Sequence, residues 1–116
     1  MTIDRRFLLT AALPALIVSL LTSRAAEASS WDGVWNGMLG TRYPWPIAVA
    51  IAGGKVVSYT ENGASFAVQY TRITPTTVFF GDRDHYSVKL TRTGDATASA
   101  KVRGRIGTGY ASLKKG

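Results

Sequence analysis

The one histidine of the chain follows two carboxylates in the segment Gly-Asp-Arg-Asp-His, residues 81–85. An imidazole beside a carboxylate can act as a general base or bind a metal ion. However, no serine or cysteine nucleophile motif and no second cluster of metal ligands accompanies His85. Asp82 and Asp84 are too few for a calcium loop. We therefore interpret this segment as a polar turn and expect no catalytic residue, no metal site, no cofactor and no enzymatic activity.

Aromatic side chains crowd the stretch between residues 31 and 45, which contains all three tryptophans. Tyr43 and Trp45 lie around Pro44 in a predicted loop, where aromatic rings can line the mouth of a pocket or contact a protein partner. Trp35 begins a predicted strand, and its ring can instead seal one end of the fold. Our candidate ligand-binding residues are Trp35, Tyr43, Trp45 and Tyr59.

The whole chain has a formal net charge of +7, and its positive charge is concentrated in the last third. Residues 29–84 carry equal numbers of basic and acidic side chains, whereas residues 85–116 contain Asp95 as their only acid. This asymmetry indicates an anionic partner, either a polymer or a lipid head group. The alternative is a solvated basic face that discourages pairing of sheet edges. This alternative is favoured by the lack of aromatic residues among the charges, where only Tyr110 lies, because proteins that bind single-stranded nucleic acid place such residues there. Our candidate anion-binding residues are Lys89, Lys101, Arg103, Arg105 and Lys114.

The elements that must position these residues are short strands. After residue 29 the chain shows no helical periodicity and is rich in Val, Thr, Tyr, Phe and Gly, with turn signals roughly every ten residues. Short connections favour antiparallel neighbours and hence a meander. The pattern predicts an all-β fold with about eight strands, at residues 33–39, 46–52, 56–61, 65–71, 76–81, 85–92, 96–103 and 108–114.

Alternation of apolar and polar residues predicts which face of each strand is buried. A three-residue loop at residues 53–55 places Val57 and Tyr59 on the same inner face as the isoleucines of strand 46–52. Asn-Gly at residues 62–63 predicts a tight turn. The inward residues predicted in later strands are Tyr86, Val88, Leu90, Ala96, Ala98, Ala100 and Val102.

A meander with one apolar face is best closed into an up-and-down barrel, because closure removes exposed sheet edges. An open, strongly curled sheet is the alternative. The small inward alanines of strand 96–103 either let the barrel close tightly or leave a cavity. A barrel of about eight strands is just wide enough for side chains or for one small ligand. The short chain favours the filled interior.

Trp35 stands in the segment Gly-Val-Trp-Asn-Gly, residues 33–37, at the start of the first predicted strand. This segment resembles the Gly-x-Trp opening of calycin-type barrels, the lipocalin and avidin-like families. The resemblance covers these five residues and the strand count. It implies an up-and-down barrel that binds a small ligand and is closed at one end by the tryptophan. In size and architecture the chain is also similar to the small β-barrel inhibitors that bacteria export against proteases or lysozyme.

Residues 1–28 have the features of a secretory signal peptide. Arg5 and Arg6 precede an uncharged run at residues 7–21, and Ala-Glu-Ala at residues 26–28 is a pattern that signal peptidase accepts. The uncharged run is short for a membrane span, which needs ~20 residues. The arginine pair also resembles a degenerate twin-arginine signal. We expect a signal helix here and cleavage after residue 28.

The remaining single domain, residues 29–116, is small and contains no cysteine. Its stability must therefore come from packing and strand pairing rather than from disulfides. We expect a periplasmic or secreted protein with no stable membrane anchor after cleavage. The favoured function is a non-enzymatic β-barrel that binds a small apolar ligand or an anionic envelope component. The alternative is a β-barrel inhibitor of an extracellular hydrolase, which would bind a protein partner.

Overall fold

A computed structural model describes residues 30–116, so the signal peptide predicted at residues 1–28 lies outside the described residues. Residues 30–116 are all-β, and none of their segments is a helix that could cross a membrane. Their strands are β1 (Gly33–Leu39), β2 (Trp45–Ala52), β3 (Lys55–Glu61), β4 (Ala64–Phe66), β5 (Tyr70–Ile73), β6 (Thr77–Asp82), β7 (Tyr86–Arg92), β8 (Thr97–Gly104) and β9 (Gly107–Lys115).

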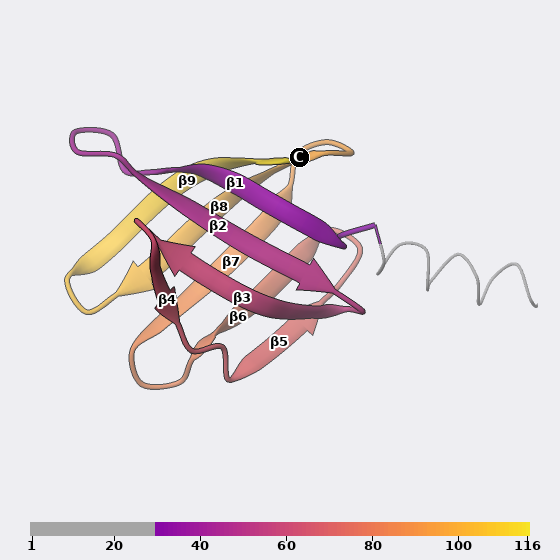
Figure 1. The fold of residues 1–116 in the computed structure, drawn as a ribbon, viewed down its shortest axis with the longest axis horizontal. Helices are drawn as coiled ribbons and strands as arrows, with labels where there is room; N and C mark the ends of the chain where they lie inside the picture. Colours follow the sequence, from indigo (N-terminus) through magenta and orange to yellow (C-terminus); the bar gives the residue numbers. More distant parts are fainter. Residues whose placement is uncertain (1–29) are drawn as a thin grey trace, which may run out of the picture.

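All of these strands belong to one antiparallel sheet that curls into a half-barrel, with β1 to β4 in front of β6 to β9 in Figure 1. Their order in the sheet is β4-β3-β2-β1-β9-β8-β7-β6-β5. Every pair of strands consecutive in the chain, except β4 and β5, is therefore paired, which confirms the antiparallel meander. The first and last strands also pair, with Trp35 opposite Lys115 and Leu39 opposite Ala111.

The sheet is open between β4 and β5, so the architecture is the curled open sheet rather than the closed barrel. The predicted strand 65–71 is interrupted after β4, and the chain resumes as β5. In the interruption, the Ala67 carbonyl accepts a hydrogen bond from the Tyr86 hydroxyl (2.7 Å). Nearer the turn between β2 and β3, the Val56 N–H donates to Thr71 Oγ1 (3.2 Å). Side-chain hydrogen bonds thus bridge the seam where a backbone ladder would complete a barrel.

The turn between β2 and β3 differs from the predicted three-residue loop. Gly53 and Gly54 form a two-residue turn with positive φ angles of 60° and 74°, a conformation whose twist suits a hairpin. A β-bulge after the turn absorbs one residue of β3. It leaves Val57 exposed, contrary to the prediction, and returns Tyr59 to the core. Bulges re-aim side chains in this way.

Most of the other predicted features of the sheet are present. Residues 62–63 form the expected tight turn, with positive φ at both Asn62 and Gly63. Ala96 is exposed and precedes β8, so its predicted inward position is wrong. The remaining predicted inward residues of β7 and β8 are buried, namely Tyr86, Val88, Leu90, Ala98, Ala100 and Val102.

Two tryptophans close one end of the half-barrel. Trp31 and Trp35 are fully buried, with ring centroids 5.1 Å apart. The Trp35 Nε1–H donates to the Trp31 carbonyl (2.8 Å), and the Trp31 Nε1–H donates to the Thr74 carbonyl (3.0 Å). The Arg92 guanidinium lies 4.3 Å from the Trp31 ring centroid, and the Lys115 ammonium lies 5.5 Å from that of Trp35. These contacts are cation–π interactions that cover the rings and seal this end.

Candidate ligand-binding site

The opposite end of the half-barrel is open and contains a pocket of about 680 Å³. This volume lies in the range of small-molecule sites, roughly 300–1,000 Å³. The pocket lies where β1, β6 and β8 end and where β2, β7 and β9 begin. Its larger apolar lining residues are Leu39, Trp45, Phe66, Tyr86, Val102 and Ile106. Its charged or ionisable lining residues are Glu61, Asp82, His85 and Arg105.

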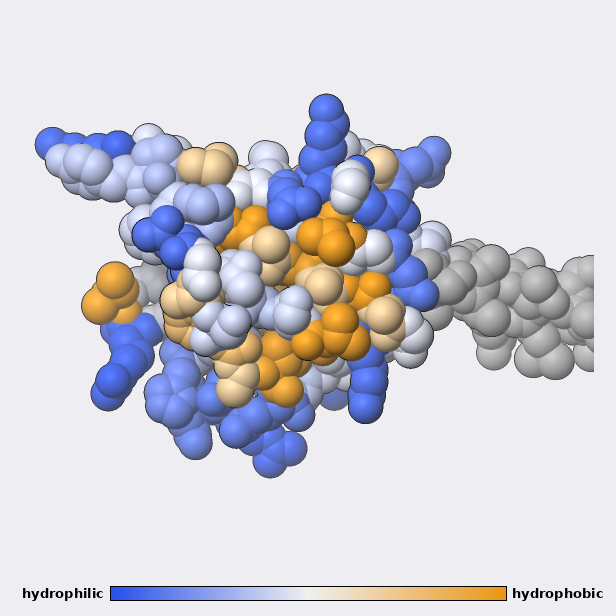
Figure 2. Space-filling model, viewed as in Figure 1, coloured by the Kyte–Doolittle hydropathy of each residue, from blue (hydrophilic) through white to orange (hydrophobic). Residues whose placement is uncertain are grey.

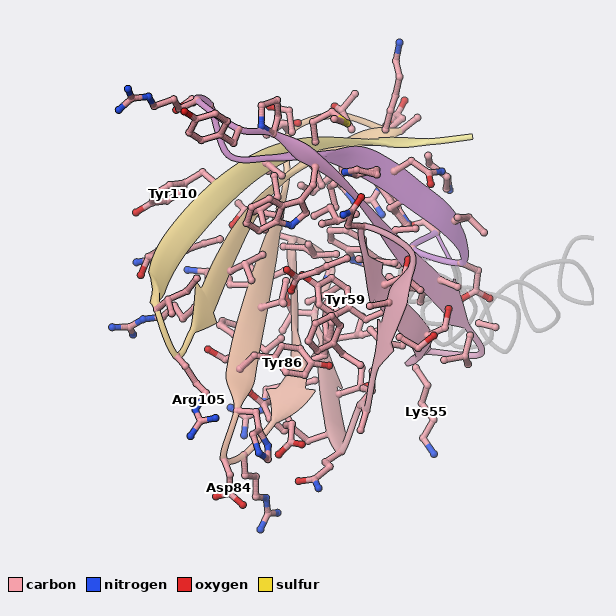
Figure 3. All side chains as sticks on the ribbon, turned by 60° about the vertical axis from the view of Figure 1, so that its left-hand side comes forward. Lys55, Tyr59, Asp84, Tyr86, Arg105 and Tyr110 are labelled. Atoms are coloured by element: carbon pink, nitrogen blue, oxygen red, sulfur yellow. The ribbon has the colours of Figure 1, made fainter. Side chains whose placement is uncertain are left out.

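Aromatic rings form the floor of this pocket. Tyr59 stacks on Tyr86 with ring centroids 5.3 Å apart and an interplanar angle of 21°. Phe66 lies 5.8 Å from Tyr59, and Phe80 meets the same ring edge-on at 5.2 Å. Figure 3 shows Tyr59 and Tyr86 pointing into the interior of the curled sheet. Phe66 and Tyr86 line the pocket, and Tyr59 and Phe80 pack behind them, so the floor rests on aromatic side chains from β3, β4, β6 and β7.

A carboxylate is held in place at the pocket mouth. Glu61 accepts hydrogen bonds from the Tyr59 hydroxyl (2.9 Å) and from Trp45 Nε1–H (3.3 Å). Burial raises the pKa of Tyr59 well above its usual value, and the hydrogen bond to Glu61 raises this pKa further. Tyr59 therefore remains a neutral donor, which orients Glu61 and ties the Trp45 ring to the rim.

The segment around His85 forms the polar turn that its residue types suggest. The Asp84 N–H donates to Asp82 Oδ1 (3.1 Å), and His85 Nδ1 lies 3.1 Å from Asp82 Oδ2. The Asp84 N–H is the main cause of a lowered pKa at Asp82, and the His85 ring lowers this pKa further. Within residues 30–116, no group of three or more potential ligands is arranged to hold a metal ion.

The four candidate ligand-binding residues lie in different places. Trp45 lines the pocket, and Tyr59 lies beneath it in the aromatic floor. Trp35 is part of the sealed end, at the other end of β1 from the pocket. Tyr43 is 76 % exposed in the loop between β1 and β2 and does not line the pocket. Arg105, which the sequence places among the anion-binding candidates, lies at the pocket rim.

Glycines on β8 and β9 create much of the pocket space, and the sequence interpretation missed them. Gly104, Gly107 and Gly109 line the pocket where larger side chains would fill it. A Cβ atom added at Gly104 would meet no atom within 4 Å, so it would extend into open space. Gly107 and Gly109 alternate with the buried Ala111, and this period of two is the signal that reveals their inward orientation.

The basic candidates on the outer face are only partly brought together. Lys89 on β7 lies directly opposite Lys101 on β8, which in turn lies opposite Tyr110 on β9. Arg103 lies two residues farther along β8, opposite Thr108. Lys114, near the other end of β9, is also exposed and pairs with Thr97. The pair Lys89 and Lys101 is therefore the centre of this basic surface.

The outer face of β1 to β3 has a different character from that of β7 to β9. Val34, Met38 and Val57 are exposed there, and Val34 is paired with the half-buried Ala50 of β2. Figure 2 shows apolar residues gathered in the middle of the face over β2 and β3, with hydrophilic residues around them. The outer surface thus divides into an apolar part and a basic part, which adjoin at β1 and β9.

Comparison of the chain with protein-family models, with curated proteins and with solved structures found no match. The similarity of residues 33–37 to the opening of calycin-type barrels stays a prediction. The site itself is an apolar pocket with an aromatic floor and one open end. The Glu61 carboxylate, the His85 imidazole and the Arg105 guanidinium lie at its rim.

We expect Tyr86 to ionise only at high pH, because burial and, to a smaller extent, the charge of Asp82 raise its pKa to about 12. The raised pKa means that the contribution of Tyr86 to stability is complete below about pH 10 and is lost as the pH rises through about 12. In a titration of tyrosinate absorbance, Tyr86→Phe should remove a step near pH 12. Tyr110→Phe, which changes an exposed ring, should leave that step in place. Identical titrations for Tyr86→Phe and the unmodified protein would contradict this assignment.

Proposed function

We propose that this protein is an exported, non-enzymatic binding protein whose pocket takes a small apolar ligand. The observation that carries the proposal is the open-ended pocket of about 680 Å³ over a floor of aromatic side chains. A pocket that is mostly apolar, with a few polar groups at one end, is the usual form of a small-molecule site. The predicted signal peptide at residues 1–28 supports export to the periplasm or the cell exterior.

The pocket has a polarity that would orient its ligand. The apolar part of the ligand would lie against Phe66 and Tyr86, since these rings contact one another and line the interior. A polar group would point to the rim, where Glu61, His85 and Arg105 can donate or accept hydrogen bonds. We therefore favour a ligand with a ring or branched hydrocarbon body and one polar end.

For His85 our proposal is recognition rather than catalysis. Asp82 Oδ2 lies 3.1 Å from His85 Nδ1 and orients the ring. A general base would instead need a hydroxyl nucleophile within hydrogen-bonding reach. The side chain of His85 is also 63 % exposed, so water surrounds it. These groups suit recognition of a polar end better than activation of a nucleophile.

The test of the pocket is a variant that fills it. In Gly104→Phe the new ring would occupy the open space beside Val102, and we expect the affinity for N-phenyl-1-naphthylamine, a neutral fluorescent probe, to fall at least tenfold. The matched control, Ser58→Phe, adds the same ring to an exposed position of β3 away from the pocket and should bind the probe normally. Fluorescence titration at low and high salt provides both values.

The outcome that would overturn the proposal is equal probe affinity in Gly104→Phe and Ser58→Phe. Circular dichroism of both variants must first show the same folded signal. Probe binding that disappears in high salt would also argue against an apolar site, because burial of a neutral ring does not depend on screening of charges. Salt-insensitive binding that is lost only in Gly104→Phe would support the pocket.

The alternative function, inhibition of an extracellular hydrolase, is supported by two exposed apolar side chains near the open end. Ile106, in the turn between β8 and β9, is 99 % exposed, and Tyr43 lies in the loop between β1 and β2. Exposed anchors on tight turns can insert into the cleft of a partner. This alternative ranks second because an inhibitor has no need for the open pocket behind these residues.

A further inference from the structure

A second hollow, of about 700 Å³, lies on the outer face of the sheet across β1, β9, β8 and β7. We call it the outer hollow. Its long side chains are Met38, Lys89, Lys101 and Tyr110, and no acidic residue lines it. Figure 3 shows Tyr110 pointing away from the interior that holds Tyr59 and Tyr86. The outer hollow is therefore a feature of the outer surface, and Gly40 is the one residue that it shares with the lining of the ligand pocket.

The two lysines of the outer hollow repel each other. Lys89 and Lys101 are directly opposite on neighbouring antiparallel strands, where Cβ atoms are about 5 Å apart and like charges are destabilising. The single ion pair within residues 30–116 joins His85 to Asp82, so neither lysine is neutralised by a carboxylate there. The Lys89 ammonium lies 5.5 Å from the ring centroid of Phe79 on β6, on the side of β7 away from Lys101. An anion bound between the two lysines would draw this ammonium toward Lys101 and remove the repulsion.

Hydroxyl groups form the next row of the outer hollow. Thr91 lies opposite Ser99, and Ser99 lies opposite Ser112, so three hydroxyls from β7, β8 and β9 follow one another across the sheet. Each can donate a hydrogen bond to an anionic oxygen. Two positive charges beside three hydroxyl donors provide the contacts that a phosphate group needs, with no competing carboxylate.

An apolar rim adjoins these polar groups. Met38 on β1 is 50 % exposed, and Tyr110 on β9 is 64 % exposed. Met38 belongs to the apolar outer part of β1 to β3 described above, so the hollow lies on the boundary between the apolar and the basic surface. Tyrosine is enriched where one side meets hydrocarbon and the other meets water. This combination of apolar and basic side chains is typical of surfaces that bind anionic lipid bilayers.

We propose that the outer hollow docks the protein on a bilayer containing anionic phospholipid, with a headgroup phosphate between Lys89 and Lys101. The hydroxyl row would bind the remaining phosphate oxygens, and Met38 and Tyr110 would enter the interface. A single-stranded nucleic acid fits less well, because its bases need successive free aromatic rings. Phe79, the other ring beside the lysine pair, is covered by the Lys89 ammonium at 5.5 Å. This docking uses a different face from the proposed pocket.

Co-sedimentation with vesicles tests the docking. We expect the protein to bind vesicles of phosphatidylcholine and phosphatidylglycerol, but not vesicles of phosphatidylcholine alone. Replacing Lys89 and Lys101 together with glutamine should weaken binding about thirtyfold, since each basic residue near an anionic surface contributes about fivefold. The matched control is the double variant Lys55→Gln and Arg83→Gln, which removes the same charge from two exposed positions outside the hollow. It should weaken binding much less.

Three results would overturn the docking proposal. Equal weakening in the two double variants would show that net charge alone drives binding. Equal binding to vesicles with and without phosphatidylglycerol would remove the role of the phosphate site. Binding of an oligothymidylate that requires Lys89 and Lys101, without vesicle binding, would assign the hollow to nucleic acid. Gly104→Phe should bind vesicles normally, so failure of the pocket and failure of the docking surface are distinguishable.

Discussion

Replacing Trp35 with alanine should lower the free energy of unfolding by about 3–5 kcal/mol, the usual cost of removing a fully buried tryptophan. The loss is expected to be at the upper end because several further contacts depend on this ring, including one with the Arg92 guanidinium 5.6 Å from its centroid. Trp31 packs against it at 5.1 Å, the Lys115 ammonium lies over it, and its Nε1–H satisfies the Trp31 carbonyl. Without the ring, the sealed end would contain a cavity and an unsatisfied carbonyl.

Urea denaturation followed by circular dichroism measures this loss. Trp45→Ala is the matched control, because its ring is 37 % exposed at the pocket mouth and has only one hydrogen bond, to Glu61. We expect the control to lose about 1 kcal/mol or less of stability. Equal losses in the two variants would mean that the sealed end does not depend on Trp35.

Alanine at Gly37 should also be strongly destabilising, by about 3 kcal/mol, because overpacking here cannot be relieved by a side chain alone. A Cβ atom at this position would overlap the Ser112 carbonyl oxygen and lie 2.6 Å from the Leu113 side chain. The overlapping atom belongs to the backbone of β9, so the whole strand would have to move away from β1. The substitution would therefore weaken the pairing that joins the first strand to the last.

Hydrogen exchange in β1 and β9, together with urea denaturation, tests this effect. The control is Gly104→Ala, since a Cβ at Gly104 meets no atom within 4 Å. Alanine there should be neutral or stabilising by up to about 1 kcal/mol, because it restricts the unfolded chain. If Gly37→Ala exchanged as slowly as the unmodified protein, the close approach of β1 and β9 would be wrong.

The strands could be predicted because each alternates polar and apolar residues, a signal that local sequence carries. The alternation of Val88, Lys89 and Leu90 gave the correct faces of β7. The bulge in β3 could not be predicted, because Val56 and Val57 are equally apolar and only the geometry of the neighbouring turn decides which one is buried. The open seam likewise depends on contacts between β3 and β5, which are remote from the local pattern.

The candidate site was predictable where a residue type alone suggests a role. Trp45 is a large aromatic residue next to turn signals and lies at the pocket, whereas Arg105, which we predicted as an anion-binding residue, lies at the pocket rim. The pocket-lining glycines Gly104, Gly107 and Gly109 were not predicted, because a glycine has no side chain that would suggest a pocket. A Gly-rich stretch such as the one around Gly104 is instead typical of a turn. That Lys101 lies directly opposite Lys89 could not be predicted, because it depends on the register between β7 and β8 and not on the residue types alone.

The pairing of β1 with β9 has a consequence for how this domain folds. The hairpins between consecutive strands can form while the chain is still being synthesised, because each needs only local segments. The ladder between Trp35 and Lys115 cannot form until β9 has emerged. Contacts of such high sequence separation slow folding, since the loop between them must be ordered before they form. We therefore expect the pairing of β1 with β9 to form late in folding, so that until then β1 lacks one of its two neighbouring strands.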